Sequence, residues 1–184
     1  SGRPLTQLPW ILLSEKPVLD GFTRVIRQTY RMPDGRESEW DVVAGDRSVA
    51  VVAMTTDGSF VTVRQFRPGP GRVLDELPGG DVDSGERVEP AAARELLEET
   101  GYEAGTIELV GSSWMSAKGQ LRQFCAVARD CRYSGPARSD AEEFMDVRLV
   151  DLATLLSIVR SGGLTDQGLA YRALDHLGLL QAGC

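Results

Sequence analysis

Three glutamates within one short stretch have the type and spacing to bind a metal ion. Glu95, Glu98 and Glu99 lie in the segment PAAARELLEET, which runs from Pro90 to Thr100. In an α-helix, positions i, i+3 and i+4 share one face, where unpaired carboxylates repel one another. Carboxylate oxygens favour hard cations such as Mg²⁺ or Mn²⁺, which keep coordination positions for water and substrate phosphates. The spacing predicts a metal site for phosphate chemistry, and a solvated acidic face is the alternative.

The helix that must carry these glutamates has ends that can be read from the sequence. Pro90 suits the first turn of a helix and Gly101 suits the position just past its end. A helix is therefore predicted from about Glu89 to Thr100. Three apolar residues project from its other side and are expected to be buried: Ala93, Leu96 and Leu97.

A longer pattern surrounds this helix. Gly80 is followed by five residues and Glu86, then by seven residues and the run RELxEExG, which begins at Arg94. This reproduces every fixed position of the signature of the Nudix hydrolases, and the chain strongly resembles that family. The last signature position is usually aliphatic and is here Tyr102, which can still fill an apolar site. An EF-hand and a Gly-Lys-Ser/Thr phosphate loop do not fit the sequence.

Two further segments resemble the ADP-ribose pyrophosphatase-like branch of that family. The letters RQFR, which begin at Arg64, resemble its VRQYR segment, and LDELPGG, which ends at Gly80, resembles its LELPAG segment. The resemblance implies that the backbone carbonyl of Gly79 binds metal and that Glu76 contacts substrate or metal. It also implies that Arg64 and Arg67 contact phosphate or a partner subunit, with surface ion pairing as the alternative.

The sequence leaves a carboxylate or a metal-bound hydroxide as the catalytic base. The only histidine, His176, lies in a leucine-rich segment, which excludes a Ser-His-Asp triad, an HExxH zinc site and a histidine base. The acidic run SDAEE at 139–143 resembles the loop that brings a further catalytic glutamate over the metals. Glu143 aligns best as the base and Glu142 is its close competitor, while Glu98 of the helix is the alternative.

Two signature residues are expected to support the metal ligands. Glu86 is expected to bind a metal directly or through water. Arg94 is expected to hold the metal-binding glutamates in place by ion pairing, without contacting the metal itself.

The N-terminal part of the chain predicts an antiparallel β-hairpin. One strand is expected from Phe22 to Met32, a turn at Pro33-Asp34-Gly35, and a returning strand from Ser38 to Ala44. In the branch that the chain resembles, such a hairpin is exchanged or packed across a dimer and its aromatic residues help to hold the nucleotide base. The candidates for that contact are Trp40, Tyr30 and Phe22. Packing of a dimer or domain interface is the alternative.

The remaining elements complete an α/β fold. Strands are expected at 48–54, 59–66, 106–113 and 121–128, and helices capped by Asp151 and by Thr165 or Asp166. With the resemblance, they imply a Nudix α/β/α sandwich with a mixed β-sheet. Residues 1–45 are expected to form the hairpin region for dimerisation, and residues 46–184 the Nudix domain.

Composition narrows the function further. The 184 residues, 42% apolar and 26% charged, are enough for one globular domain with a real core. A net charge of −7 argues against unspecific nucleic-acid binding, and no apolar run reaches the roughly 18 residues of a membrane span. Three cysteines without metal spacing favour free thiols in a reduced, cytoplasmic compartment.

These observations lead to one expected function and its rivals. We expect a homodimeric enzyme that uses Mg²⁺ to hydrolyse the pyrophosphate of a nucleoside diphosphate linked to a sugar, ADP-ribose or another nucleotide sugar. ADP-ribose pyrophosphatases usually carry a proline about where Ala117 stands, so the resemblance to that branch is incomplete at the position that sorts substrates. A dinucleotide such as NADH or a dinucleoside polyphosphate is the alternative substrate. Two other functions are possible: a catalytically silent sensor or interaction module, and an isomerase. The intact Glu98 and Glu99 argue against the silent module.

Overall fold

The structure is a computed structural model that describes residues 9–138 and 144–180. The chain divides into two compact units. Described residues up to 46, together with 114–122, form the first unit, and those from 47 to 113 and from 123 onward form the second. The division into a dimerisation region at residues 1–45 and a Nudix domain at residues 46–184 stays a prediction.

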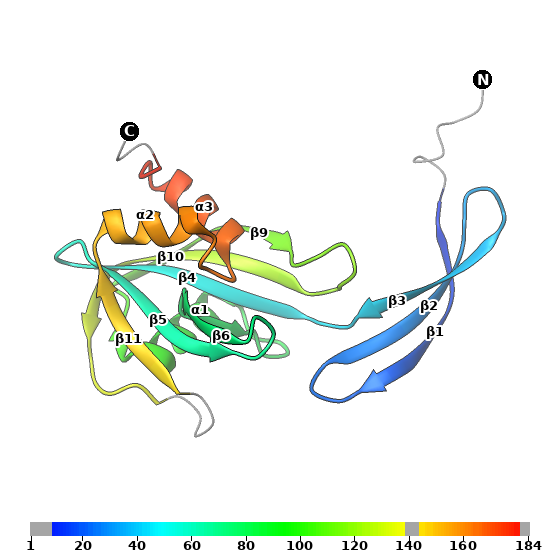
Figure 1. Cartoon of the computed structure of the whole chain (residues 1–184), viewed down its shortest axis with the longest axis horizontal. Coiled ribbons are helices and arrows are strands. Elements are labelled where there is room, and N and C mark those ends of the chain that lie inside the picture. Colours follow the sequence, from blue (N-terminus) through cyan, green and yellow to red (C-terminus); the bar gives the residue numbers. More distant parts are fainter. Residues whose placement is uncertain (1–8, 139–143, 181–184) are drawn as a thin grey trace. The chain divides into compact units, whose positions relative to one another are not determined.

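The first unit is a three-stranded antiparallel sheet. Its strands follow the order β1 (Ile11–Asp20), β2 (Arg24–Arg31) and β3 (Glu37–Val43) (Figure 1). The predicted hairpin is β2–β3, and its turn contains Gly35 at a φ of 87°, which glycine adopts without strain. The segment 114–122 joins this sheet through β3, because Val43 N donates to Lys118 O at 2.8 Å and Gln120 N donates to Val43 O at 2.9 Å.

Strand β1 was not expected from the sequence. Its pairing with β2 shifts register between Leu12 and Ser14 and again between Pro17 and Leu19. Each irregularity breaks the alternation of side chains on which strand prediction depends. Phe22, expected in a strand, instead lies in the bend between β1 and β2, fully exposed.

The second unit is built on an eight-stranded sheet. Its strands are β4 (Arg47–Thr55), β5 (Phe60–Arg67), β6 (Arg72–Glu76), β7 (Gly79–Asp81), β8 (Tyr102–Glu103), β9 (Thr106–Trp114), β10 (Arg122–Tyr133) and β11 (Met145–Val150). The main path runs β11-β5-β4-β10-β8, with β6 beside β5, β7 beside β4 and β9 beside β10. The strands β6, β7 and β8 were not predicted, and β7 and β8, with three and two residues, are too short to display a pattern.

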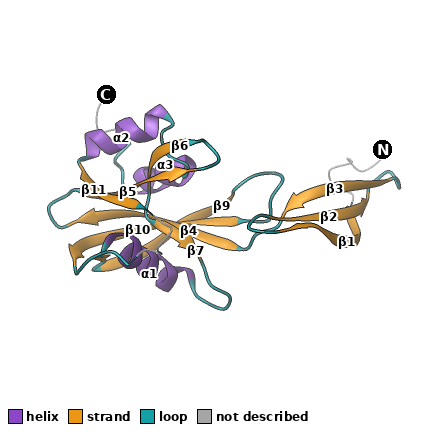
Figure 2. Ribbon diagram, turned by 60° about the horizontal axis from the view of Figure 1, so that its bottom comes forward, coloured by secondary structure: helices purple, strands orange, loops and turns teal. Residues whose placement is uncertain are grey.

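Helices cover both faces of this sheet. Figure 2 shows α1 (Val88–Thr100) on one face and both α2 (Leu152–Ser161) and α3 (Gln167–His176) on the other. This is the predicted α/β/α sandwich. The ends of α1 also match, because Gly101 adopts a φ of 75° and its N–H donates to Leu97 O at 2.8 Å. None of the described helices combines the length and apolar character needed to cross a membrane.

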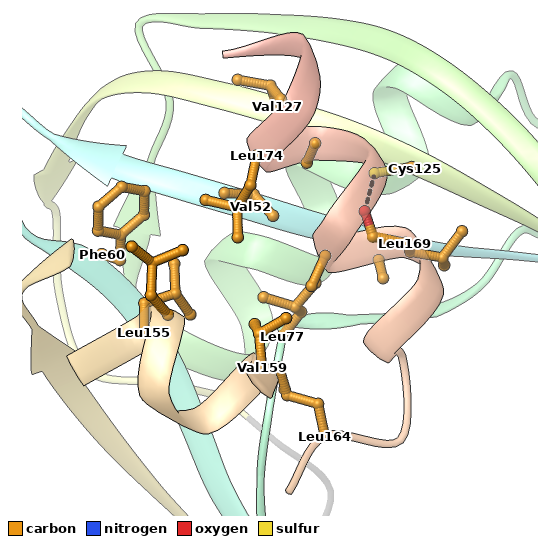
Figure 3. Close-up of a cluster of buried hydrophobic side chains, with 14 of the residues drawn as sticks. Val52, Phe60, Leu77, Cys125, Val127, Leu155, Val159, Leu164, Leu169 and Leu174 are labelled. Carbon is orange, nitrogen blue, oxygen red and sulfur yellow. Dashed lines mark hydrogen bonds between the residues drawn. The ribbon is translucent and has the colours of Figure 1, made fainter. Parts of the chain in front are cut away.

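Each face of the sheet carries its own hydrophobic core. Between the sheet and α2 and α3, Leu155, Val159, Leu169 and Leu174 pack against strand residues such as Val52 (Figure 3). On the other face, α1 buries one stripe of residues: Val88, Ala91, Ala92, Leu96 and Glu99.

That stripe corrects the predicted face of α1. Leu96 is fully buried as expected, but Ala93 is exposed and Leu97 is only half-buried. Ala91 and Ala92 form the buried side instead, which turns Glu99 to the edge of the core. The three glutamates therefore differ in burial.

The described cysteines behave as structural apolar residues. Cys125 and Cys131 are buried and form no disulfide, in line with the expected free thiols. Burial raises the pKa of the Cys125 thiol to about 12 and that of Cys131 to about 11. Both thiols are protonated near neutral pH and therefore poor nucleophiles.

Candidate metal and phosphate site

The two glycines of β7 allow the strand to approach its neighbours closely. Gly79 pairs with Ala50 of β4, and a Cβ on Gly79 would overlap the Val49 carbonyl oxygen. A Cβ on Gly80 would lie 2.6 Å from Oε2 of Glu95. A side chain at position 80 would therefore displace the Glu95 carboxylate from the space that it occupies.

Glu99 links α1 to the same strand. Its buried carboxylate accepts a hydrogen bond from Gly79 N at 2.8 Å. A buried carboxylate needs such partners, since burial without a hydrogen bond is costly. The hydrogen bond fixes the backbone of Gly79 beside the C-terminal turn of α1.

Arg94 connects the other acids of the signature. Its Nη1 donates to Glu95 at 2.7 Å and to Glu98 at 3.2 Å. Its Nη2 donates to Glu86 at 3.0 Å and to the carbonyl of Asp81 at 3.0 Å. The carboxylates are therefore not unpaired, as the sequence suggested, because an arginine rather than a lysine offsets their repulsion.

The ionisation of these acids follows from their surroundings. The Arg94 guanidinium, with the backbone N–H of Asp83, holds the pKa of Glu86 below its usual range. Burial raises the pKa of Glu95, and the bond from Arg94 opposes that rise. The pKa values of these two acids therefore shift in opposite directions, because hydrogen bonds to the charged form dominate at Glu86 and burial dominates at Glu95.

These side chains line a cavity of about 490 Å³. Strand β5 supplies Gln65 and Arg67, β7 supplies Gly79, Gly80 and Asp81, α1 supplies Arg94, Glu95, Glu98 and Glu99, and Arg138 follows β10. Carboxylates and guanidinium groups thus face one space. Such a lining suits a phosphate together with the cation that neutralises it.

The donor chemistry fits a hard divalent cation. Within the described ranges, no three acidic, thiol or imidazole groups already converge on a single point. Glu95 and Glu98 are held by Arg94, and Glu99 by Gly79 N. The oxygens on this wall are nevertheless those that Mg²⁺ and Mn²⁺ prefer.

The two arginines of β5 fall on opposite faces of the strand. Side chains alternate along a strand, so Arg67 and Gln65 face the cavity while Arg64 faces away from it. Arg64 lies 3.9 Å from Asp75 on that other face. The structure therefore brings only one of the two expected arginines to the site.

Glu76 is placed behind the cavity wall. It is 1% exposed, and its carboxylate accepts hydrogen bonds from Gln65, Arg67 and Thr165. A direct contact of Glu76 with substrate or metal stays a prediction.

Arg138 was missed by the sequence reasoning. Its backbone N–H donates to Glu98 O at 2.6 Å, which ties the chain after β10 to the end of α1. The signal in the sequence was its position directly before the acidic run. Glu142 and Glu143 lie outside the described residues, so their catalytic roles stay predictions.

The first unit holds a separate cluster of aromatic rings. Trp10 meets Tyr30 and Trp40 edge to face, with centroid distances of 6.3 Å and 6.4 Å. These rings line a cavity of about 430 Å³, in which Tyr30 donates to Gln28 at 3.2 Å. Trp10 had not been predicted, because it precedes the unpredicted strand β1, and Phe22 does not line this cavity.

Comparison with known proteins identifies the family. The NUDIX domain model matches residues 44–167. The chain belongs to the Nudix family. Its sequence is 33% identical over 154 residues to ADP-ribose pyrophosphatase of Bacillus subtilis (strain 168), covering 82% of each chain. It is 28% identical over 154 residues to the methanol dehydrogenase activator of Bacillus methanolicus, again covering 82% of each.

A solved structure supports the fold of this Nudix chain. The crystal structure of an ADP compounds hydrolase superposes with a TM-score of 0.77 at 19% identity, covering 94% of this chain and 98% of the other. The predicted family and α/β architecture are thus confirmed. The protein is a Nudix pyrophosphohydrolase.

Proposed function

We propose that this Nudix enzyme hydrolyses the pyrophosphate of a nucleoside diphosphate linked to a sugar, with ADP-ribose as the leading substrate, and that it requires Mg²⁺ or Mn²⁺. The observation that carries the proposal is a single cavity lined by Glu95, Glu98 and Glu99 together with Arg67 and Arg138. The name of the Bacillus subtilis relative supports the choice of substrate.

The α1 side of the cavity would hold the metal. Glu95, Glu98 and Glu99 would supply carboxylate oxygens, Gly79 its backbone carbonyl, and Glu86 a direct or water-mediated contact. A bound divalent cation neutralises phosphate charge and makes water more acidic. Arg94 would orient the carboxylates through its bonds to Glu95 and Glu98.

The arginine side would bind the diphosphate. Arg67 uses Nε and Nη2 to hold Glu76, and its Nη1 has no partner among the described residues. Arg138 lines the same cavity. Guanidinium groups match phosphate oxygens in geometry and charge, so these two residues would fix the substrate.

Deprotonation of the attacking water is assigned to the acidic run. We infer that Glu143 is the base, with Glu142 as competitor. Replacing each with Gln and following kcat against pH is expected to show the larger loss, and loss of the acidic limb, for only one of them. Wild-type profiles for both variants would move the base to Glu98 or Glu95.

The nucleotide base is assigned to the aromatic cluster of the first unit. Trp10, Tyr30 and Trp40 provide ring faces and edges for a planar heterocycle, and Gln28 provides a polar group beside them. We propose that the enzyme is a homodimer and that this unit contributes to the site of the partner copy.

A substrate panel with Mg²⁺ tests the reaction. ADP-ribose, other nucleotide sugars, NADH and a dinucleoside polyphosphate are incubated with the enzyme, and the products are separated. We expect nucleoside monophosphate from ADP-ribose and none after chelation of the metal. Tight binding of ADP-ribose without products would instead favour the silent sensor.

Glu99→Gln tests the metal assignment. The amide oxygen can still accept from Gly79 N, so the fold is expected to persist, while turnover falls by about two orders of magnitude or more with the loss of a charged ligand. Glu89→Gln is the matched control, since Glu89 lies in the first turn of the same helix and pairs with Arg87. Equal rates for wild type and Glu99→Gln would refute the assignment.

A further inference from the structure

Behind the cavity wall, a buried carboxylate holds the arginine assigned to phosphate binding. Glu76 is 1% exposed and lies on β6. Arg67 donates to it from Nε at 2.7 and 2.9 Å and from Nη2 at 2.7 Å. This two-pronged contact fixes the plane of the guanidinium as well as its position.

The same carboxylate is bound by a residue that is distant in sequence. Thr165 precedes α3 in the connection that follows α2, and its hydroxyl donates to Oε1 of Glu76 at 2.7 Å. Gln65 Nε2 donates to Oε2 at 2.8 Å. Both carboxylate oxygens of Glu76 therefore have two kinds of donor, one from Arg67 and one from a neutral side chain.

A second acid, Asp166, lies near the Glu76 carboxylate and the Arg67 guanidinium. Asp166, next to Thr165, accepts from Gln123 at 3.3 Å. Burial raises the pKa of Asp166, the nearby Glu76 carboxylate raises it further, and Arg67 opposes the rise. Arg67 is thus a positive charge near two acids, and of these only Glu76 forms hydrogen bonds with it.

We propose that Thr165 is a positioning residue for substrate binding: its hydroxyl fixes Glu76, and Glu76 fixes the Arg67 guanidinium against the cavity. The proposal rests on the proposed function, because Arg67 must meet a phosphate for its orientation to matter. A side chain held in its bound geometry loses less conformational entropy when the ligand arrives. The α2–α3 connection, which carries no signature residue, thereby sets affinity for the diphosphate.

The alternative is that the Thr165 hydroxyl only anchors the α2–α3 connection. An anchor would change stability and leave diphosphate binding alone, whereas a positioning residue acts through Arg67. The two roles are separated by measuring binding, kinetics and thermal unfolding on the same variants.

The variants remove or retain one hydroxyl. Thr165→Val deletes it at constant shape, Thr165→Ser retains it, and Thr55→Val is the matched control, because the Thr55 hydroxyl also donates to a carboxylate, that of Asp57 in the β4–β5 turn. Thr165→Ala provides the same deletion if the valine variant does not fold. Binding of α,β-methylene ADP, a diphosphate that resists hydrolysis, is measured by calorimetry alongside KM and kcat for ADP-ribose.

We expect Thr165→Val to weaken α,β-methylene ADP binding and to raise KM by about tenfold, the upper end of the cost of immobilising one flexible side chain on binding. We expect kcat to stay within about twofold, since the loss is of uniform binding. Thr165→Ser and Thr55→Val should both remain within about twofold of wild type in binding. Unchanged binding in Thr165→Val, with or without a lower unfolding temperature, would overturn the proposal.

A double-mutant cycle with Arg67→Ala gives the decisive measurement. If Thr165 acts through Arg67, Thr165→Val changes probe binding by less than about twofold once Arg67 is absent. Additive losses would show that Thr165 acts by another route and would overturn the proposal. A wild type that binds the probe and hydrolyses no substrate of the panel refutes the proposed reaction, while the cycle still decides the role of Thr165. A wild type that does not bind the probe refutes both.

Discussion

At the residue scale, the glycines and acids of the site depend on one another for space. Gly80 has no side chain where the Glu95 carboxylate lies, and Gly79 N–H satisfies the buried Glu99. The close approach of a strand to a helix therefore requires particular residues on both elements. A larger residue in place of Gly80 on β7 should therefore displace the Glu95 carboxylate.

Gly80→Ala is expected to lower kcat by about tenfold or more while the protein stays folded. The new Cβ would lie within 2.6 to 2.8 Å of the Glu95 carboxyl atoms, so the carboxylate must move, and small displacements of catalytic groups are costly. Gly69→Ala is the control, because nothing lies within 4 Å of a Cβ there. Rates with saturating Mg²⁺ and circular dichroism check both; a wild-type rate for Gly80→Ala would show that Glu95 is not needed in this place.

Asp166→Asn should stabilise the protein at neutral pH. Burial and the nearby Glu76 raise the pKa of Asp166 in the folded state, opposed by Arg67, so ionisation of Asp166 costs stability as pH rises through that value. Below about 3.8, its ordinary pKa, both states carry a neutral side chain and the gain from Asn disappears. Urea unfolding from pH 4 to 8 measures it, with Asp175→Asn, exposed on the same helix, as control for charge removal. A gain independent of pH would contradict this cause.

At the element scale, β5 serves the core and the cavity with alternate residues. Val61 and Val63 are buried on the α1 face, and Gln65 and Arg67 continue that face into the cavity. The opposite face carries Thr62, whose fully buried hydroxyl has no hydrogen-bond partner among the described residues. The strand thus contains one polar group that costs stability.

Thr62→Val is expected to stabilise the protein by about 1 kcal/mol, because an isosteric methyl replaces an unpaired buried hydroxyl. Thr100→Val is the comparison variant, because the same substitution there removes a buried hydroxyl that has hydrogen-bond partners. The Thr100 hydroxyl donates to Leu96 O and accepts from Tyr102 N, so its removal should destabilise by about 1 to 2 kcal/mol. Denaturant unfolding compares the two, and changes of the same sign in both would be inconsistent with this explanation.

The sequence predicted elements that are defined by local signals. Pro90 and Gly101 bound α1 within a residue or two, and Asp151 caps α2 by accepting from Thr154 N. Strand β1 was missed because its bulges break the alternation, and the bond between Thr165 and Glu76 joins residues 89 apart. Contacts of that kind arise from packing and leave no local pattern.

At the scale of the whole molecule, the first unit exposes more apolar surface than a single chain would be expected to show. All ten residues of β1 are exposed, among them Ile11, Leu12, Leu13 and Leu19. Edge strands and large apolar patches are commonly covered by another chain. This surface supports the proposed homodimer.

Light scattering is expected to give a dimer of the 20.0 kDa chain at micromolar concentration. Leu12→Lys should shift the protein to monomer and lower activity, because a lysine in a covered apolar interface would lose its hydration. Leu149→Lys, at an exposed position of β11, is the control. A monomeric and fully active wild type would rule the dimer out.

The position of Arg94 indicates that the protein can fold before it binds metal. One guanidinium already lies between Glu86, Glu95 and Glu98, so the acidic helix can form without a cation to relieve its repulsion. Small zinc proteins, by contrast, stay unfolded until the ion arrives. Here synthesis and folding can finish first and metal loading can follow. A preparation stripped by a chelator should therefore keep its unfolding temperature within a few degrees and recover full turnover as soon as the ion is returned.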